Sequence, residues 1–318
     1  MRQDIETAVA IIEATKEKPE MLNIDFCKYR PIYARATENV EGIVNVIDFT
    51  KKVILTPCSS SDHIFNMLLC GATSIDTYDI NIFTSYFFYL KEAALRTLNY
   101  ELFLEFFCPS NFFTRSNAFS DSLYFVIEKN IQNSEVKEFW NYLYNRYGGK
   151  RLYHSNLFIQ NYYRQNTYIE SNPYLKNKEN YEVVRQKLEN YQFRFFHINI
   201  FQLATTKILF DNIYDIIYLS NILDTMEIEN EIQYTLKIKE IIECLMEYLS
   251  TNGVIAVCYL YCYLDDYWYD YQQGRLKSYH IRQQYFKDDY YYADFAGIGD
   301  LKSRLVKNRD ALMLTRKK

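Results

Sequence analysis

Residues 53–81, VILTPCSSSDHIFNMLLCGATSIDTYDIN, constrain the fold of this chain more than any other stretch. They read as a strand, a tight turn, a short amphipathic helix and a second strand. The apolar runs at 52–57 and 74–79 are short and rich in β-branched and aromatic residues, as strands buried on both faces of a parallel sheet are. Because parallel strands need a crossover connection, this order predicts a βαβ unit.

Further apolar runs of the same kind follow, at 193–199, 214–219, 253–260 and 311–315. Short strands that alternate with helical patterns predict an α/β fold with a doubly wound, mostly parallel, Rossmann-like sheet. The clearest helical pattern covers residues 81–107, and its apolar face is formed by Phe83, Phe87, Leu90, Ala94 and Leu98.

We expect an N-terminal helical cap or lid over residues 1–50 and a Rossmann-like domain over residues 51–318. The interval at about 109–190 is too long for an ordinary crossover and is expected to form a helical insertion. Within it, residues 134–147 and 178–191 both have helical patterns. A second insertion, rich in tyrosine, is expected at about 263–296.

The formal net charge of -4 disfavours partners that require a basic face. Nucleic acid and anionic lipid are such partners, so we expect no nucleic-acid binding and at most peripheral membrane contact. The chain has neither an apolar run of about 20 residues nor the features of a signal peptide, which predicts a cytoplasmic location. Its 7 cysteines and 4 histidines are scattered, which predicts neither a disulfide framework nor a metal site.

The small-residue turn PCSSSDH suits a polar or anionic group, because a turn between a strand and a helix offers backbone N–H groups and hydroxyls. Asp79 follows 17 residues after Asp62, at the end of the second strand, where a carboxylate can accept both hydroxyls of a ribose. The turn lacks the glycines that admit a pyrophosphate, which favours S-adenosylmethionine over NAD. An ordinary βαβ unit with an incidental acidic end remains the alternative.

Several segments resemble a known family. SSSDHIFNMLLCGATSIDTYDIN followed by YLKEAALRTLNYELFLEFF is similar to the S-adenosylmethionine:diacylglycerol 3-amino-3-carboxypropyltransferase family of betaine-lipid synthesis. IYARATEN, YDIIYLSNILD and the segment at 172–203 resemble further parts of that family. The resemblance implies a class I methyltransferase-like fold and an S-adenosylmethionine-dependent transferase.

The resemblance also implies site residues, and the residues alone suggest one more. The cofactor-binding positions that match the family's motifs are Ser59, Asp62, Asp79, Asn81, Ser220 and Asn221. Ser61 stands where the family has a turn glycine and is included with them, and Asn199, at the end of the third strand, is a candidate partner for adenine. The candidate catalytic residues are Tyr33, Glu38 and Asp224. Thr37 and Asn39 depart from the family's pattern.

The expected reaction transfers the 3-amino-3-carboxypropyl group to a lipid or small-molecule acceptor, because the resemblance points there. Methyl transfer by an enzyme of the same fold is one alternative. A non-catalytic binding module, in which the βαβ core serves as a scaffold, is the other.

Overall fold

The structure is a computed structural model that describes residues 1–14, 28–36, 38–108, 118–159, 165–205, 212–220, 222, 231–258, 291–300 and 309–317. Two compact units divide the chain. Unit 1 comprises residues 1–37, 58–65 and 79–192, and unit 2 comprises residues 38–57, 66–78 and 193–318. The expected division into cap, domain and insertions stays a prediction. Among the described residues, none of the helices combines the length and apolar character that a membrane span requires.

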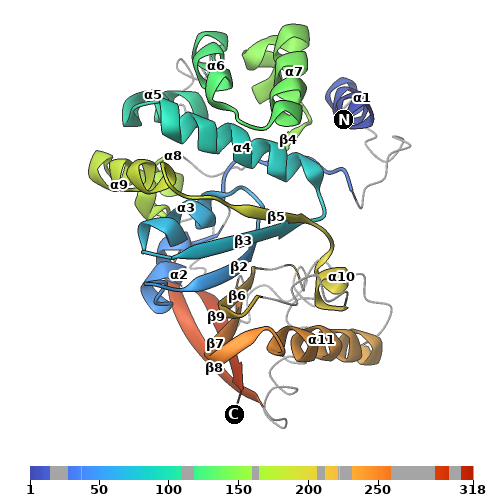
Figure 1. Cartoon of the computed structure of the whole chain (residues 1–318), viewed down its shortest axis with the longest axis vertical. Helices are drawn as coiled ribbons and strands as arrows, with labels where there is room; N and C mark the ends of the chain where they lie inside the picture. The colour runs from blue at the N-terminus through green and yellow to red at the C-terminus, as the bar shows by residue number, and fades with distance from the viewer. Residues whose placement is uncertain are drawn as a thin grey trace. The chain divides into compact units, whose positions relative to one another are not determined.

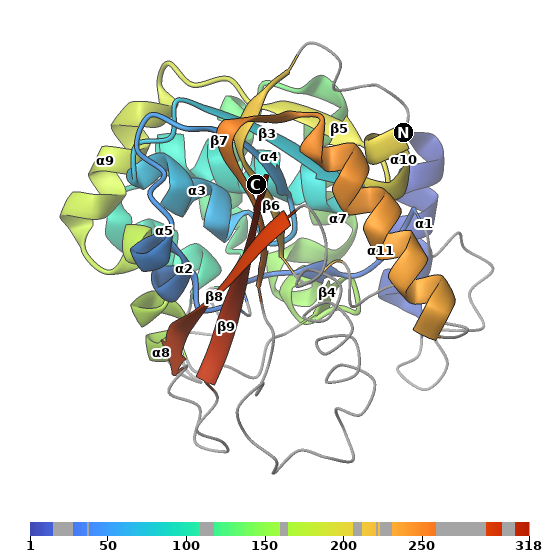
Figure 2. The same ribbon diagram turned by 90° about the horizontal axis from the view of Figure 1, so that it is seen from below.

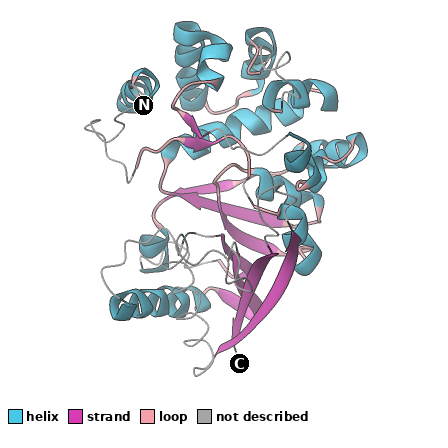
Figure 3. Cartoon of the chain, turned by 180° about the vertical axis from the view of Figure 1, so that it is seen from behind, coloured by secondary structure: helices cyan, strands magenta, loops and turns pink. Residues whose placement is uncertain are grey.

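Unit 2 is built on a 7-stranded sheet with the order β5-β3-β2-β6-β7-β9-β8, drawn in magenta in Figure 3. The pairs β2 and β3, β2 and β6, and β6 and β7 are parallel, whereas β9 runs antiparallel to both β7 and β8. The strands are β2 (Val53–Pro57), β3 (Ser74–Asp79), β5 (Arg194–His197), β6 (Tyr214–Ser220), β7 (Leu249–Cys258), β8 (Tyr291–Asp300) and β9 (Arg309–Lys317).

The strand order identifies the fold. Numbered along the chain, the strands of this sheet lie in the order 3-2-1-4-5-7-6, which is the common Rossmann order with an antiparallel last strand inserted before the sixth. The order reverses between β2 and β6, so the sheet is doubly wound and mostly parallel, as the sequence predicts. The βαβ unit is also confirmed, with α3 (Asp62–Leu69) between β2 and β3.

One strand begins at the end of the expected tyrosine-rich insertion. Residues 263–290 of that insertion, expected at about 263–296, lie outside the described residues, and its last residues belong to β8, which begins at Tyr291. Tyrosine is a favourable strand residue, and β9 offers β8 an antiparallel partner, with Tyr291 opposite Lys317 and Asp300 opposite Arg309. The end of the tyrosine-rich segment is therefore an edge strand, paired with β9.

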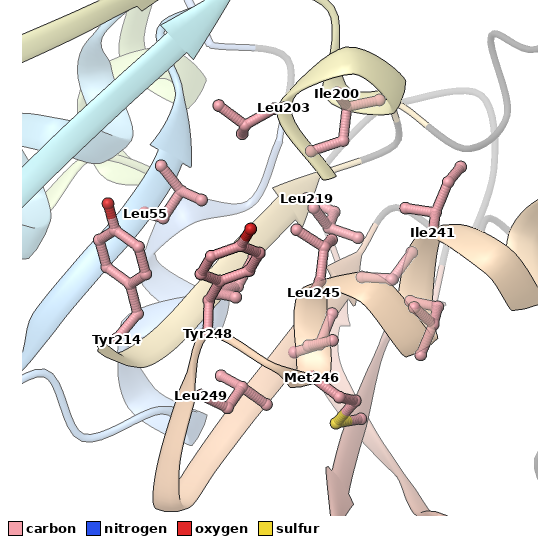
Figure 4. Close-up of a cluster of buried hydrophobic side chains, with 14 of the residues drawn as sticks. Leu55, Ile200, Leu203, Tyr214, Leu219, Ile241, Leu245, Met246, Tyr248 and Leu249 are labelled. Atoms are coloured by element: carbon pink, nitrogen blue, oxygen red, sulfur yellow. The ribbon is translucent and has the colours of Figure 1, made fainter. Parts of the chain in front are cut away.

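The core of unit 2 lies where two helices pack against the sheet. Ile200 and Leu203 come from α10 (Ile200–Thr205), and Ile241 and Leu245 come from α11 (Glu231–Met246). Figure 4 shows these side chains gathered with Leu219 of β6, and Figure 2 shows α11 leading into β7. A third helix, α2 (Val40–Val46), begins after Asn39, whose side chain accepts a hydrogen bond from Gly42 N.

Unit 1 is mainly helical (Figure 1). A short parallel pair joins β1 (Ile32–Tyr33) to β4 (Phe158–Ile159). The remaining elements are α1 (Arg2–Glu13), α4 (Ile82–Thr97), α5 (Tyr100–Phe107), α6 (Asp121–Ile127), η3 (Glu128–Asn130), α7 (Ser134–Tyr153), α8 (Gln165–Glu170), η4 (Pro173–Leu175) and α9 (Lys178–Leu188).

The predicted helix over residues 81–107 is in fact two helices. Leu98 leaves the helical conformation, with φ -89° and ψ 151°, and Asn99 accepts a hydrogen bond from Leu102 N to begin α5. The apolar spacing is continuous across this break, so periodicity alone did not locate it. The helices predicted at 134–147 and 178–191 are confirmed as α7 and α9, although α7 continues to Tyr153 past a non-helical Gly148 and α9 ends at Leu188.

Candidate functional site

The turn after β2 adopts a conformation that normally favours glycine. Ser59 has φ 44° and Ser61 has φ 71°, both in the left-handed region. The turn is closed by a hydrogen bond from Ser61 N to the carbonyl oxygen of Cys58, 2.8 Å long. Ser59 and Ser61 therefore hold, with side chains, a backbone conformation that glycine adopts more readily.

Asp79 ties this turn to the end of β3. Its Oδ2 accepts a hydrogen bond from Ser59 N at 3.1 Å, and its Oδ1 accepts one from Asn81 N at 3.0 Å. The residue is partly exposed. These two backbone donors fix the orientation of the Asp79 carboxylate beside the turn. The structure therefore brings together Ser59 and Asp79, two of the predicted cofactor residues.

Asn81, another predicted cofactor residue, forms hydrogen bonds with the main chain of Arg30 and Phe83. Its Oδ1 accepts hydrogen bonds from Phe83 N, which caps α4, and from Arg30 N, while its Nδ2 donates to the carbonyl oxygen of Arg30. The side chain is buried. Asn81 thus fixes both the start of α4 and the segment that leads into β1.

Asp62 is the centre of a buried polar cluster. Its Oδ1 accepts hydrogen bonds from Lys91 Nζ at 2.7 Å, from Tyr168 Oη at 2.7 Å and from Tyr174 Oη at 2.8 Å. Its Oδ2 accepts hydrogen bonds from Ala36 N at 2.7 Å and from Ser60 Oγ at 3.0 Å. We call Asp62, Lys91, Tyr168, Tyr174 and Ser60 the Asp62 cluster. The predicted cofactor residue Asp62 therefore anchors the turn from inside.

Charge compensation explains how Asp62 stays ionised in the interior. Burial alone raises the pKa of this carboxyl, but the Lys91 ammonium and the hydroxyls of Tyr168 and Tyr174 outweigh burial and hold the pKa below its ordinary value. The pKa values of the two tyrosines are raised well above 10.0 by burial and by the Asp62 charge. The tyrosines are therefore fixed as hydrogen-bond donors.

Lys91 was not among the predicted site residues, although the sequence carries a signal for it. It follows Phe87 by four positions and precedes Ala94 by three, so it lies on the apolar face of the helix. A lysine on a buried face requires an anionic partner. Lys91 also donates to the carbonyl oxygen of Ser60 at 2.8 Å, and its ammonium lies 5.3 Å from the centre of the Phe87 ring.

Arg35 lies beside the Asp62 cluster in unit 1. The side chain is buried, and its Nη2 donates to the carbonyl oxygen of Phe107 at 3.2 Å and to Tyr153 Oη at 3.3 Å. The guanidinium lies 5.4 Å from the centre of the Tyr168 ring, a cation–π contact. Arg35 and Ala36 thus connect the IYARATEN segment to the same cluster that anchors the turn.

Glu38 and Ser220 come together in unit 2, at the end of β6. Tyr218 Oη donates to Glu38 Oε2 at 2.6 Å, and Ser220 Oγ donates to Glu38 Oε1. Ser220 has φ 53°, which turns the chain sharply as the strand ends. One predicted catalytic residue and one predicted cofactor residue therefore meet, with the carboxylate fixed by two hydroxyls.

The structure does not bring together the other predicted site residues that it describes. Asn199 caps α10, since its Oδ1 accepts a hydrogen bond from Phe201 N at 2.9 Å, which is a structural use of a side chain expected to meet adenine. Tyr33 is 44% exposed on β1. Asn221, Asp224 and Thr37 lie outside the described residues.

Neither thiolate nor metal chemistry has a candidate at the turn. Cys58 is fully buried, and burial strongly raises the pKa of its thiol. Its Sγ contacts Ser61 Oγ at 3.8 Å and donates to the carbonyl oxygen of Thr84 at 3.5 Å. In the part of the chain that the structure describes, no group of three or more His, Cys, Asp or Glu side chains is arranged to hold a metal ion.

Two comparisons with known protein sequences find no match for this chain. No protein-family model matches it, and the search of curated proteins finds no match either. The resemblance to the aminocarboxypropyltransferase family therefore stays a prediction.

Among solved structures the similarity is distant. An rRNA methylase from Streptococcus thermophilus matches with TM-score 0.32 and 7% identity, over 87% of this chain and 93% of that one. The rRNA methyltransferase aviRa from Streptomyces viridochromogenes matches with TM-score 0.34 and 11% identity, over 83% and 76%. The methyltransferase domain of bacterial CtHen1 matches with TM-score 0.38 and 11% identity, over 87% and 96%. All three scores are low, so the fold assignment rests on strand order and direction instead.

Proposed function

We propose that the chain is an S-adenosylmethionine-dependent transferase. The observation that carries this proposal is the pair of hydrogen bonds that Asp79 accepts from Ser59 N and Asn81 N. They fix a partly exposed carboxylate directly beside a small-residue turn, the arrangement that an adenosine-containing ligand requires. Asp79 would accept hydrogen bonds from the ribose hydroxyls, and the turn would hold the polar methionine end.

The charge balance of the turn supports a ligand that carries its own carboxylate. An ionised Asp62 without a counter-ion would repel such a group. Lys91 lies 2.7 Å from Asp62 and is equally buried, so the pair has no net charge. The α3 helix, which begins at Asp62, adds the positive end of its dipole.

NAD fits these residues less well. A pyrophosphate has to approach the backbone closely, and dinucleotide-binding turns provide glycines for that approach. Residues 58–62 of this chain are Cys-Ser-Ser-Ser-Asp, and the side chains of Ser60 and Ser61 are buried within the turn. A ligand without phosphate therefore suits it better.

For the reaction we propose transfer of the 3-amino-3-carboxypropyl group, on the strength of the sequence resemblance. Bound S-adenosylmethionine would supply electrophilic carbons beside its sulfonium. The protein then has to orient an acceptor in line with one of those carbons and take up its proton. Glu38, Tyr33 and Asp224 are the proposed acceptor-handling residues, and Glu38 is held for such a role by Tyr218 and Ser220.

The proposed acceptor is a lipid or small molecule with a hydroxyl or amine. The net charge of -4 motivates this choice over nucleic acid. Because net charge describes the chain as a whole, the acceptor panel should also contain RNA. A panel of diacylglycerol vesicles, soluble alcohols and amines, and an RNA oligonucleotide separates the three classes.

Product analysis tests the reaction type. The protein is incubated with S-adenosylmethionine and each acceptor, and the nucleoside product is identified by mass spectrometry. Methylthioadenosine supports the proposed transfer, whereas S-adenosylhomocysteine assigns methyl transfer and contradicts the aminocarboxypropyl proposal. If the protein binds S-adenosylmethionine but forms neither product, the cofactor assignment is retained and the tested acceptors are rejected.

A further inference from the structure

A second candidate binding site lies in unit 1, in a part of the chain that the proposed function does not use. A surface cavity of about 650 Å³ opens between the carboxyl end of α1 and the carboxyl half of α7. The two helices lie side by side in Figure 1 and contact each other. The cavity has the volume of a small-molecule site, which is commonly about 300–1,000 Å³.

The lining of this cavity is basic. Lys150 and Arg151 both contribute to it, and within the described residues neither side chain forms an ion pair. The acidic residue at the end of α1, Glu13, is already bound to Arg146 at 2.7 Å and to the hydroxyl of Tyr147 at 2.7 Å. Glu13 also attracts Arg151 electrostatically, but one carboxylate faces three cations, Arg146, Lys150 and Arg151, so a net positive charge remains at the cavity.

These charges are not needed to satisfy the ends of the helices. The carbonyl oxygen of Leu152, in the last turn of α7, accepts hydrogen bonds from Ser155 N at 3.0 Å and Ser155 Oγ at 2.7 Å. The carbonyl oxygen of Ala14, after α1, accepts one from Asn156 Nδ2 at 2.6 Å. Because Ser155 and Asn156 already donate hydrogen bonds to these carbonyl oxygens, Lys150 and Arg151 are not required there and remain available to a ligand.

One of the two cations is also held in position. The Arg151 guanidinium lies 4.9 Å from the centre of the Tyr147 ring, and the Tyr147 hydroxyl is fixed by Glu13. This cation–π contact restrains the guanidinium, whose planar set of N–H donors matches two oxygens of a phosphate. His154 lines the same cavity.

We propose that this cavity binds a phosphate-bearing small molecule, with Arg151 and Lys150 as the phosphate-binding residues. The volume exceeds that of phosphate alone, so the rest of the molecule is expected to lie against Tyr147, Ile12 and Ala14. The proposal is independent of the S-adenosylmethionine assignment, since no residue of the cavity belongs to the turn or the Asp62 cluster.

Calorimetric titration of the full chain tests this proposal, with inorganic phosphate and glycerol 3-phosphate as separate ligands in a chloride buffer. The variant is Lys150→Gln/Arg151→Gln, and the control is Lys137→Gln, which removes a cation from the first half of α7. We expect saturable binding of at least one ligand, weakened about tenfold or more in the double variant and unchanged in the control. Tighter binding of glycerol 3-phosphate than of inorganic phosphate would show that the cavity also contacts the glycerol part of the ligand.

Two results would overturn the proposal. One is the absence of saturable binding of either ligand at concentrations up to about 10 mM. The other is binding that the double variant retains in full, which would place the anion elsewhere. Thermal unfolding of the double variant, alongside the wild-type chain, verifies that a lost signal is not lost folding.

Discussion

Lys91 Nζ lies 2.7 Å from Asp62 Oδ1, and both side chains are completely shielded from solvent. Removing one partner of such a pair leaves an uncompensated charge in the interior. We therefore expect Lys91→Met to lower the free energy of unfolding by about 3–5 kcal/mol. Urea denaturation of the variant and the wild-type chain measures this difference.

A matched double variant provides the control for this prediction. Asp62→Asn/Lys91→Met removes both charges, so it is expected to be more stable than Lys91→Met alone. A double variant that is less stable than the single one would show that the charge of Asp62 is not what Lys91 compensates.

The same pair predicts how stability depends on pH. The pKa of Asp62 is lower in the folded chain than its ordinary value of 3.8, since Lys91 and the two tyrosine hydroxyls outweigh burial. Such a carboxyl contributes stability above its unfolded pKa and loses that contribution as the pH falls through the folded pKa. We expect the free energy of unfolding to decrease with falling pH below about pH 4, and less steeply in Asp62→Asn/Lys91→Met. Equal slopes would exclude Asp62 as the group responsible.

The turn conformation predicts a stabilising substitution. Ser61 has φ 71°, which costs a residue with a side chain about 1 kcal/mol or more relative to glycine. Ser61→Gly is expected to raise the free energy of unfolding by up to about 1 kcal/mol, less what its contact with Cys58 contributes. Ser60→Gly serves as the control, because Ser60 donates to Asp62 and its loss should destabilise the chain. The reverse ranking would contradict the assignment of strain to Ser61.

Two adjacent glycines in α7 predict unequal sensitivities. A Cβ on Gly149 would lie 1.6 Å from the carbonyl oxygen of Phe119, whereas one on Gly148 would meet nothing closer than Asp121 Oδ2 at 3.6 Å. Gly149→Ala should therefore cost more than about 4 kcal/mol, and Gly148→Ala should cost about 1–3 kcal/mol, because its φ of 69° and ψ of 156° suit glycine almost exclusively. Melting temperatures of the two variants rank them, and a milder effect at Gly149 would refute the close approach.

The part of the fold that the sequence predicted well depends on local periodicity. β2, α3 and β3 follow one another within residues 53–79, and their apolar spacing is enough to define them. The Asp62 cluster was not predictable in this way, because Tyr168 and Tyr174 lie 106 and 112 residues from Asp62 along the chain. Only the folded chain brings them together.

Among the site residues, too, some could be predicted from the sequence and others could not. The turn and Asp79 were expected to be neighbours because both follow adjacent parallel strands, and the hydrogen bond from Ser59 N confirms that they are. Asn81 was predicted from the family resemblance and Asn199 from its position at the end of a strand, yet both side chains cap the helices that follow. Asparagine is a common N-cap residue, so its place before a helix indicated capping as well as binding.

The central claim is that the turn and Asp79 hold S-adenosylmethionine, and calorimetric titration tests it most directly. The wild-type chain is titrated beside Asp79→Ala and beside Asp48→Ala, which removes an exposed carboxylate that also accepts a backbone N–H, from Thr50 at 2.9 Å. NAD serves as the second ligand. We predict saturable binding of S-adenosylmethionine alone, retained in Asp48→Ala and lost in Asp79→Ala. A folded wild-type chain that binds neither ligand would contradict the account and favour a non-catalytic scaffold.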